Sequence, residues 1–321
     1  MKRNFVIPFF ILLNTGLLST TASADVLRAT VVRVATLYVS PDTNSAKLRN
    51  VERGRDMVVM ETIPNWVHVE ATLGVVTSNS YDEQEPQVVT GWILDKGVVK
   101  ASDPDGDKII FGEAVDSEDQ ASQRHGRRGA ADDALRLYYR AAEYFPKSPL
   151  AGEAMYRSAD IRWQIEKVDV MTRPSAKEQE AYLRQGMNED HMKEVMKKFP
   201  GTKWADLAAF HLIDNKLCGD WLGASKCPMK EAEIYENYAK DHPQSPAAAE
   251  ALYDAAYRWS ALIEIYKTEE QAKKSEESKS KAVGLAKRLV EQFPQGDWGA
   301  RAQRLLYLIE QGVPTYGNAQ E

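Results

Sequence analysis

The chain has 321 residues, and its 47 aspartates and glutamates outnumber its 41 lysines and arginines, giving a formal net charge of −6 at pH 7. A length of this order favours two domains over one. The acidic balance argues against nucleic acid as the main partner, because nucleic-acid-binding chains favour a basic face.

The first 24 residues are typical of a secretory signal peptide. Lys2 and Arg3 precede an apolar run at residues 5–13, and small residues ending in Ala22-Ser23-Ala24 follow it. This is the order of a positive start, an apolar core and a cleavage site. A membrane anchor is the alternative, but the run is shorter than the ~20 residues of a span. We expect cleavage after Ala24, a periplasmic or secreted location, and no stable membrane span in the mature chain.

Residues 26–100 are dominated by β-forming side chains. Residues 66–70 alternate between apolar and polar as a half-buried strand does. Turn-forming residues separate this segment from its neighbours. Several short strands in about 75 residues predict a small all-β barrel. The four predicted strands lie at residues 30–34, 56–61, 66–70 and 88–94.

The order of motifs in this segment resembles the bacterial SH3-like domain. Leu37-Tyr38-Val39 is followed by the turn at Gly54, then by Trp66-Val67-His68-Val69 and Gly91-Trp92-Ile93. The chain departs from the family at Tyr38, where asparagine is usual, and in a long polar insertion at residues 74–86. The resemblance implies a module for peptide or cell-wall contact. We expect one of Trp66 and Trp92 to be a core residue, and the other to line a shallow groove with Tyr38.

Residues 101–130 are predicted to be a flexible linker. They contain an acidic run at residues 116–119 and a basic cluster at residues 124–129. Segments so poor in apolar residues tend to stay mobile, because they bury too little surface to offset the cost of ordering.

Three alternating aspartates in this linker resemble the start of a calcium loop. They are Asp103, Asp105 and Asp107. However, Lys108 stands where such a loop needs glycine, and its twelfth position is Ala114 rather than glutamate. We therefore expect no metal here.

A short motif around a proline recurs four times in the second half of the chain, and we call each copy a proline mark. A residue before proline is pushed out of helical geometry, so a helix ends at each mark. In three of the four, a serine or threonine two residues after the proline can cap a following helix. Each mark therefore predicts two antiparallel helices joined by a short turn. The four marks are Phe145-Pro146-Lys147-Ser148, Phe199-Pro200-Gly201-Thr202, His242-Pro243-Gln244-Ser245 and Phe293-Pro294-Gln295-Gly296.

Counting from each proline brings small residues into register. They lie five and eight positions after it, and offsets three apart fall on one helix face. Small side chains on that face let a neighbouring helix approach closely. They are Ala151, Ala205, Ala248 and Gly299 at the first offset, and Ala154, Ala208, Ala251 and Ala302 at the second.

This unit, over residues 131–312, resembles the tetratricopeptide repeat. Its prolines are farther apart than the standard period of about 34 residues, which we attribute to insertions. The Phe-Pro-x-Ser pattern is similar to repeats of the outer-membrane assembly lipoprotein and of the periplasmic partner of the Tol-Pal system. The fold class predicted is thus multidomain, an SH3-like barrel followed by an all-α helical repeat array. Residues 313–321 are predicted to be a disordered tail.

The two cysteines, Cys218 and Cys227, lie close together in a segment with two glycines. In an oxidising compartment such a pair predicts a disulfide. Two free thiols remain the alternative. A metal site is not expected, because the segment between them contains no histidine.

No catalytic constellation is recognisable. The sequence lacks a glycine-rich phosphate loop, G-x-S-x-G and H-E-x-x-H, and its five histidines are scattered. Aromatic residues recur at helical spacings, so most should be core, while a minority should serve as anchors on a concave binding face. We select Tyr139, Trp163 and Trp259 for that role.

These observations favour an exported, non-enzymatic adaptor that binds cell-envelope proteins through its helical repeats, since stacked hairpins form an extended surface. No cofactor is expected. A peptidoglycan-binding targeting protein with purely structural repeats is the alternative. A cell-wall glycan hydrolase is the third possibility.

Overall fold

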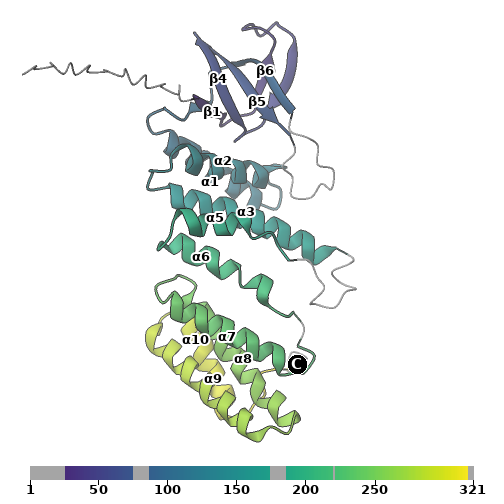
Figure 1. Ribbon diagram of the computed structural model, residues 1–321, viewed down its shortest axis with the longest axis vertical. Coiled ribbons are helices and arrows are strands. Elements are labelled where there is room, and N and C mark those ends of the chain that lie inside the picture. The colour runs from purple at the N-terminus through teal and green to yellow at the C-terminus, as the bar shows by residue number, and fades with distance from the viewer. Residues whose placement is uncertain (1–25, 75–86, 174–185, 220, 317–321) are drawn as a thin grey trace, which may run out of the picture.

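The computed structural model describes residues 26–74, 87–173, 186–219 and 221–316, with a curled sheet at one end and a stack of helices behind it (Figure 1). The predicted signal peptide, and the predicted insertion apart from Gly74, lie outside the described residues. Within the described ranges, no helix is both long enough and apolar enough to cross a membrane.

The sheet has seven strands in the order β3-β2-β6-β5-β4-β1-β7, and all its pairings are antiparallel. In the described residues it is a half-barrel with β3 and β7 at its edges, rather than the closed barrel expected. The strands are β1 (Arg28–Val31), β2 (Ala35–Tyr38), β3 (Lys47–Val51), β4 (Asp56–Ile63), β5 (Trp66–Leu73), β6 (Gln87–Leu94) and β7 (Val98–Lys100). The three predicted strands from residue 56 onward are confirmed, whereas the one at residues 30–34 ends early because the chain turns before β2.

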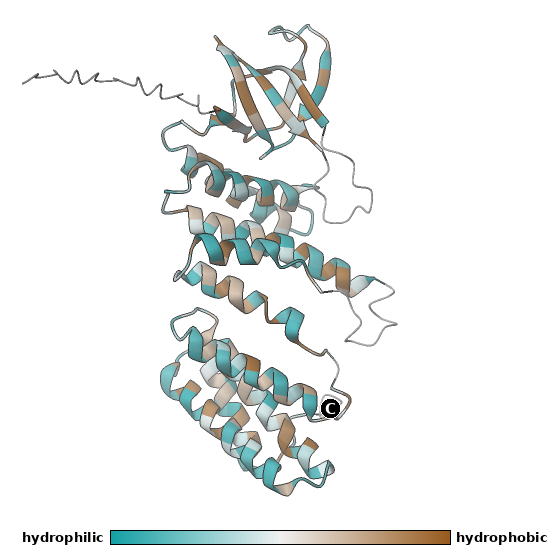
Figure 2. Cartoon of the chain, viewed as in Figure 1, coloured by the Kyte–Doolittle hydropathy of each residue, from teal (hydrophilic) through white to brown (hydrophobic). Residues whose placement is uncertain are grey.

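One face of the sheet forms its core. Along β5, Val67, Val69 and Ala71 are fully buried, while the residues between them are partly exposed. Successive side chains of a strand point to opposite faces, so this alternation fixes which face is inside. Figure 2 shows the same alternation of apolar and polar residues along the strands.

The helices form consecutive hairpins. At each of the four proline marks one helix ends and another begins, which confirms the predicted helical repeats. The helices are α1 (Gly106–Ser122), α2 (Ala130–Tyr144), α3 (Ala151–Thr172), α5 (Asp190–Lys198), α6 (Lys203–His211), α7 (Lys226–Asp241), α8 (Ala248–Thr268), α9 (Ala272–Gln292) and α10 (Asp297–Glu310). We call α3, α6, α8 and α10 the post-proline helices.

The predicted caps act at the turns themselves. Thr202 Oγ1 accepts a hydrogen bond from the Ala205 N–H at 3.4 Å, as a helix N-cap does. Ser148 and Ser245 accept from the backbone N–H two residues on, each at 3.1 Å, and so close the turn before the helix. The small residues at the two predicted offsets are all buried, which allows the close helix packing expected of them.

Residues 101–130 are not the flexible linker that their composition predicts, because α1 occupies 17 of them. Ile110, Ala114 and Ser117 are buried on one side of this helix. Few apolar residues suffice because they share one face. The average composition of residues 101–130 does not reveal this spacing of apolar residues.

The sheet and the first helices share a hydrophobic core. Val32, just after β1, and Val99 of β7 belong to the same buried cluster as Ile110, Ala114 and Leu137 from α1 and α2. This cluster joins the sheet to the helices from α1 to α6, whereas α7 to α10 pack around a second cluster. We call the contact between the sheet and helices α1 and α2 the seam.

Polar contacts reinforce the seam. The Tyr144 hydroxyl shares its single hydrogen between two acceptors, the Ala29 carbonyl at 2.7 Å and Asp56 Oδ1 at 2.5 Å. Arg28 forms ion pairs with Asp56 at 2.7 Å and with Glu143 of α2 at 3.1 Å. A hydrogen bond to a charged group is worth roughly 1.5–3 kcal/mol when buried, and less here because solvent reaches Arg28, which is 34% exposed, and Asp56, which is 25% exposed.

A glycine allows the closest approach at the seam. Gly54, in the turn before β4, has φ +73°, and a Cβ there would lie 2.6 Å from Cβ of Arg136 and 2.7 Å from the backbone nitrogen of Leu137. Its carbonyl accepts a hydrogen bond from Arg140 Nε at 3.2 Å. The predicted turn at Gly54 is therefore also a contact point with α2.

Candidate binding surfaces

Four aromatic side chains gather on the outer face of the sheet: Tyr38, Trp66, His68 and Trp92. His68 and Trp92 are cross-strand partners, and their rings stack with centroids 4.7 Å apart. Tyr38 pairs with Trp92 across β2 and β6, and its ring meets Trp66 edge-on at 5.6 Å. We call these four residues the outer aromatic cluster.

Neither tryptophan of this cluster is a core residue. Trp66 and Trp92 are both half-buried, whereas Tyr38 is only 9% exposed. The expectation that one tryptophan fills the core is therefore wrong, because Val67, Val69 and Ile93, which alternate with the tryptophans, already occupy it. His68 was not predicted as part of a site, although its spacing of two residues from Trp66 places both on one face.

A second group of aromatics follows the post-proline helices. Tyr156 of α3 stacks on Trp204 of α6 with centroids 5.5 Å apart. Tyr253 of α8 meets Trp298 of α10 at 5.4 Å. In both pairs the tyrosine lies ten residues after one proline and the tryptophan four residues after the next. We call these four half-buried residues the aromatic row.

The Tyr–Trp pair is missing between the post-proline helices α6 and α8. Ala247 stands where the tryptophan would be, and Phe210 packs instead on Tyr238 of α7 with centroids 5.1 Å apart. Asp206 of α6 accepts a hydrogen bond from His242 Nδ1 at 2.8 Å. His242 replaces the phenylalanine of the proline mark, so a polar contact takes over at this junction.

Polar groups surround the aromatic row on α3 and α6. His211 Nε2 lies 3.1 Å from the Tyr156 hydroxyl and 3.2 Å from Asp160 Oδ1. Burial alone would raise the pKa of Asp160, but its hydrogen bond and charge interaction with His211 outweigh burial and lower that pKa. Lys167 pairs with Asp214 at 2.8 Å.

On α8, the positive charges near Glu250 and Asp254 do not outweigh the burial of these two carboxylates. Burial, and then its neighbour Asp254, raise the pKa of Glu250 above the usual range. Burial also raises the pKa of Asp254, although Arg258 opposes this. Asp254 also acts on Tyr253 of the aromatic row, where the positive charges of Arg301 and Arg304 oppose it, so charges of both signs lie beside this part of the row.

The sequence-predicted anchors of the helical array are not free surface groups. Trp163 and Trp259 are 2% and 4% exposed, so they are core residues. Trp163 donates its indole N–H to Asp214 at 3.3 Å, and Trp259 donates to Glu236. Tyr139 is half-buried, with the Arg140 guanidinium 5.3 Å from its ring centroid. Helical spacing alone does not distinguish an aromatic residue that faces the core from one that faces a groove.

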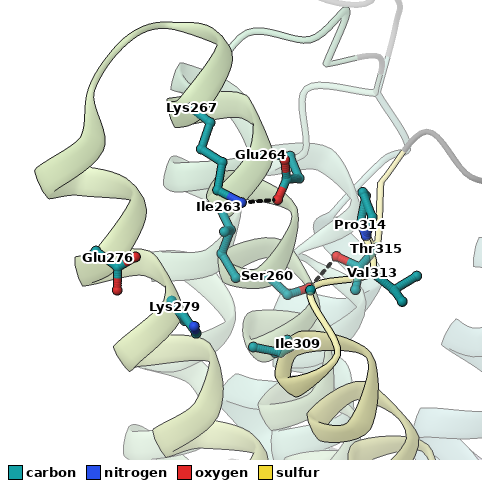
Figure 3. Close-up of a pocket in the computed structure, with 11 residues that line it drawn as sticks. Ser260, Ile263, Glu264, Lys267, Glu276, Lys279, Ile309, Val313, Pro314 and Thr315 are labelled. Carbon is teal, nitrogen blue, oxygen red and sulfur yellow. Dashed lines mark hydrogen bonds and ion pairs between the residues drawn. The ribbon is translucent and has the colours of Figure 1, made fainter.

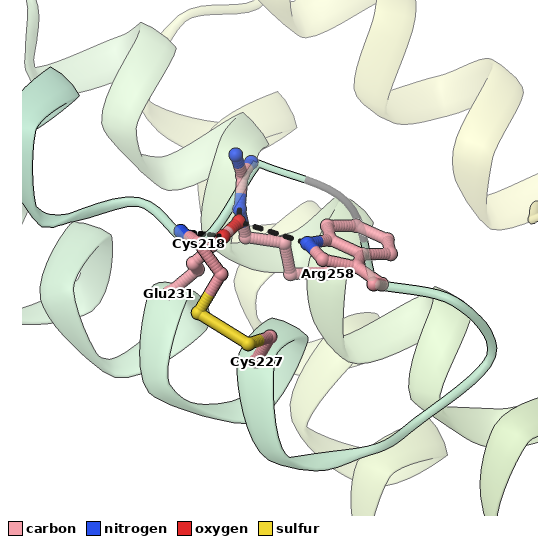
Figure 4. Close-up of a disulfide and its surroundings, with 5 residues drawn as sticks. Cys218, Cys227, Glu231 and Arg258 are labelled. Atoms are coloured by element: carbon pink, nitrogen blue, oxygen red, sulfur yellow. Dashed lines mark hydrogen bonds and ion pairs between the residues drawn. A yellow bond between two sulfur atoms is a disulfide. The ribbon is translucent and has the colours of Figure 1, made fainter. Parts of the chain in front are cut away.

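Cys218 and Cys227 form the predicted disulfide, with Cα atoms 5.9 Å apart (Figure 4). The carboxylate of Glu231, whose side chain is 2% exposed, holds the loop that the disulfide closes. It accepts hydrogen bonds from Cys218 N at 2.9 Å, from Trp221 Nε1 at 3.2 Å and from Arg258 Nε at 2.9 Å. A buried carboxylate with three donors is fully satisfied, so the loop is fastened to α7 and α8.

The three linker aspartates each have a partner within the protein. Asp103 accepts from the Lys100 N–H at 2.8 Å, Asp105 pairs with Lys108 at 2.7 Å, and Asp107 accepts from Ser148 at 2.5 Å. Over the ranges that the structure describes, no group of three or more His, Cys, Asp or Glu side chains is arranged to hold a metal ion.

No protein-family model and no curated protein matches this sequence. Among solved structures, the DHF58 filament is 16% identical and aligns over 64% of this chain and 91% of its own, with a TM-score of 0.24. The de novo designed helical repeat protein DHR64 is likewise 16% identical over 64% of this chain and 92% of its own, with a TM-score of 0.20.

Proposed function

We propose that the chain is an exported, non-enzymatic adaptor that binds cell-envelope proteins through its helical array, with the sheet as an SH3-like module for peptide or cell-wall contact. The observation that carries this proposal is the aromatic row, in which the same Tyr–Trp step recurs at the same offsets on two pairs of post-proline helices. Interface residues that dominate binding energy are enriched in tryptophan and tyrosine, and these half-buried side chains present such rings on a rigid scaffold.

The architecture supports the same function. Stacked hairpins with proline turns are similar to tetratricopeptide repeats, and such arrays act through extended surfaces rather than enclosed active sites. The disulfide supports export, because disulfides form and persist in oxidising compartments. The predicted signal peptide points the same way.

The seam adds a physical reason for combining two surfaces. Because the sheet shares a core with the helices up to α6, the outer aromatic cluster and the Tyr156–Trp204 step of the aromatic row keep a fixed relation. A partner that engages both surfaces gains from effective concentration, without a further cost for ordering the two halves of this chain.

The test is crosslinking in intact cells followed by capture of the full-length chain. The double substitution Tyr253→Ala, Trp298→Ala should abolish crosslinks to a defined envelope protein that the unchanged chain captures. The matched control is Tyr307→Ala, which removes a 60% exposed tyrosine from α10 and should leave the crosslinks intact. Equal capture by all three chains would contradict the proposal.

The second candidate is a peptidoglycan-binding targeting protein, which the outer aromatic cluster favours, because stacked, half-exposed rings suit flat apolar faces of a ligand. Here Trp66→Ala, Trp92→Ala should abolish co-sedimentation with purified peptidoglycan, while the α8–α10 double substitution leaves it unchanged. Release of soluble muropeptides by the unchanged chain would instead indicate a hydrolase.

A further inference from the structure

The chain turns back on itself after α10. Gly312 has φ +67°, and the Val313 N–H donates to the Leu308 carbonyl at 2.9 Å, which ends the helix and reverses the chain direction. Residues 313–316 then run across α8 (Figure 3). They were predicted to belong to a disordered tail, but the structure places them against the helical array.

Side-chain contacts hold this segment. Ser260 Oγ donates its single hydrogen to the Tyr257 carbonyl at 2.7 Å, so at its 2.7 Å contact with Thr315 it must accept. The Tyr316 ring lies 5.2 Å from that of Trp221. Trp221 belongs to the disulfide loop and Ser260 to α8, so the segment bridges two parts of the array.

The segment fits this surface incompletely. An open pocket of about 60 Å³ remains beside it (Figure 3). It is lined by Ser260, Ile263 and Ile309, by residues 312–315 and by the charged side chains of Glu264, Lys267, Glu276 and Lys279. Val313 itself stays 40% exposed. Protein cores are close-packed and do not leave open pockets with charged walls, so the contact has the character of a docked peptide rather than of a core element.

We propose that Trp221, Tyr257, Ser260 and Ile263 form a docking site for an extended peptide segment, which residues 313–316 occupy in cis. The chemistry of the occupant is set by the contacts of this segment: a proline, then a hydroxyl donor for Ser260, then an aromatic ring for Trp221. The kind of partner that fits is therefore a protein with an exposed Pro-Thr-Tyr-like segment. This inference rests on the proposed function, because Tyr257 and Ser260 lie on the same post-proline helix as Tyr253 of the aromatic row.

Occupancy in cis sets a threshold for the partner. A tethered segment acts at an effective concentration of about millimolar. A competing segment with the same intrinsic affinity must therefore reach that concentration locally, and one at lower concentration must bind the site correspondingly more tightly. Weak, nonspecific peptides are thereby excluded from the site.

The test uses the full-length chain, labelled with ¹⁵N, and the indole N–H signal of Trp221 in NMR spectra. In the double substitution Thr315→Gly, Tyr316→Ala this signal should shift, because the ring beside it is lost. Added peptide with the sequence of residues 311–316 should return the signal to its original position. The peptide should bind the double variant with a Kd at least about tenfold lower than that for the unchanged chain.

Three controls make the outcome decisive. A scrambled peptide should not restore the signal, Ser260→Ala in the double-variant background should weaken peptide binding, and Tyr307→Ala should change neither signal nor binding. The inference is overturned if the peptide does not restore the signal, or if it binds the unchanged chain equally well. Loss of crosslinks through the aromatic row would still support the adaptor function in that case, so the two proposals fail separately.

Discussion

Replacing Gly54 by alanine tests whether the sheet and the helices form one packed body. The added Cβ would lie 2.6 Å from Cβ of Arg136 and 2.7 Å from the backbone nitrogen of Leu137. Leu137 is fully buried, so α2 cannot move away without loosening the shared core. Overpacking of this kind costs about 1–3 kcal/mol.

Gly97 is the matched control. Its φ is +85°, and a Cβ there would meet nothing closer than 3.7 Å, at Arg33. An alanine at either position suffers the strain of a left-handed backbone, about 1–2 kcal/mol. The clash with α2 belongs to Gly54→Ala alone, so we expect a total loss of about 2–5 kcal/mol for Gly54→Ala and about 1–2 kcal/mol for Gly97→Ala.

Urea unfolding, followed by circular dichroism at the helix band, measures both losses. The helices respond to a substitution in the sheet only if the seam couples them. If the two variants unfold at the same urea concentration, or if Gly54→Ala leaves the helical transition unchanged, the seam does not contribute in the way described.

Three further predictions concern the disulfide, the aromatics and the pH dependence of the seam. Replacing both Cys218 and Cys227 by alanine should lower the free energy of unfolding by about 2–3 kcal/mol, as expected for a loop of this length, and dithiothreitol should destabilise the unchanged chain but not this variant. Trp163→Ala should cost about 3–5 kcal/mol because it empties a core position, whereas Trp92→Ala should cost less than about 2 kcal/mol in the same calorimetric comparison, because its ring is half-exposed. Burial would raise the pKa of Asp56, but hydrogen bonds from Arg28 and Tyr144 outweigh it, so this pKa is lowered. Its contribution to stability is therefore present above the unfolded pKa of about 3.9 and lost as the pH falls below it. Asp56→Asn should make the thermal unfolding temperature less dependent on pH between about 5 and 2. An unchanged slope of unfolding temperature against pH would contradict this.

Local signals in the sequence predicted much of the fold. The proline marks determine where helices end, because the restriction they impose acts on the neighbouring residue and needs no distant partner. The alternation at residues 66–70 likewise identified β5. The disulfide followed from two cysteines close together in the chain.

The errors concern long-range packing. Residues 106–122 looked too polar to fold, but Ile110 and Ala114 needed only the shared face of one helix against the sheet and α2. Trp163 and Trp259 were selected as binding anchors although their neighbours bury them. The Tyr–Trp steps of the aromatic row were overlooked as a surface, although the equal offsets of Tyr156 and Tyr253 from their prolines were visible in the sequence.

The seam also has a consequence for the end of the helical stack. A stack of hairpins exposes an apolar face at each end, and repeat proteins need a terminal cap to remain soluble. Here the sheet covers α1 and α2, burying Ile110 and Leu137, so it serves as the cap. Helices separated from the sheet would present that face to solvent and to one another, and self-association would follow. The β half thus protects the helical half from self-association through this face, whatever it binds itself.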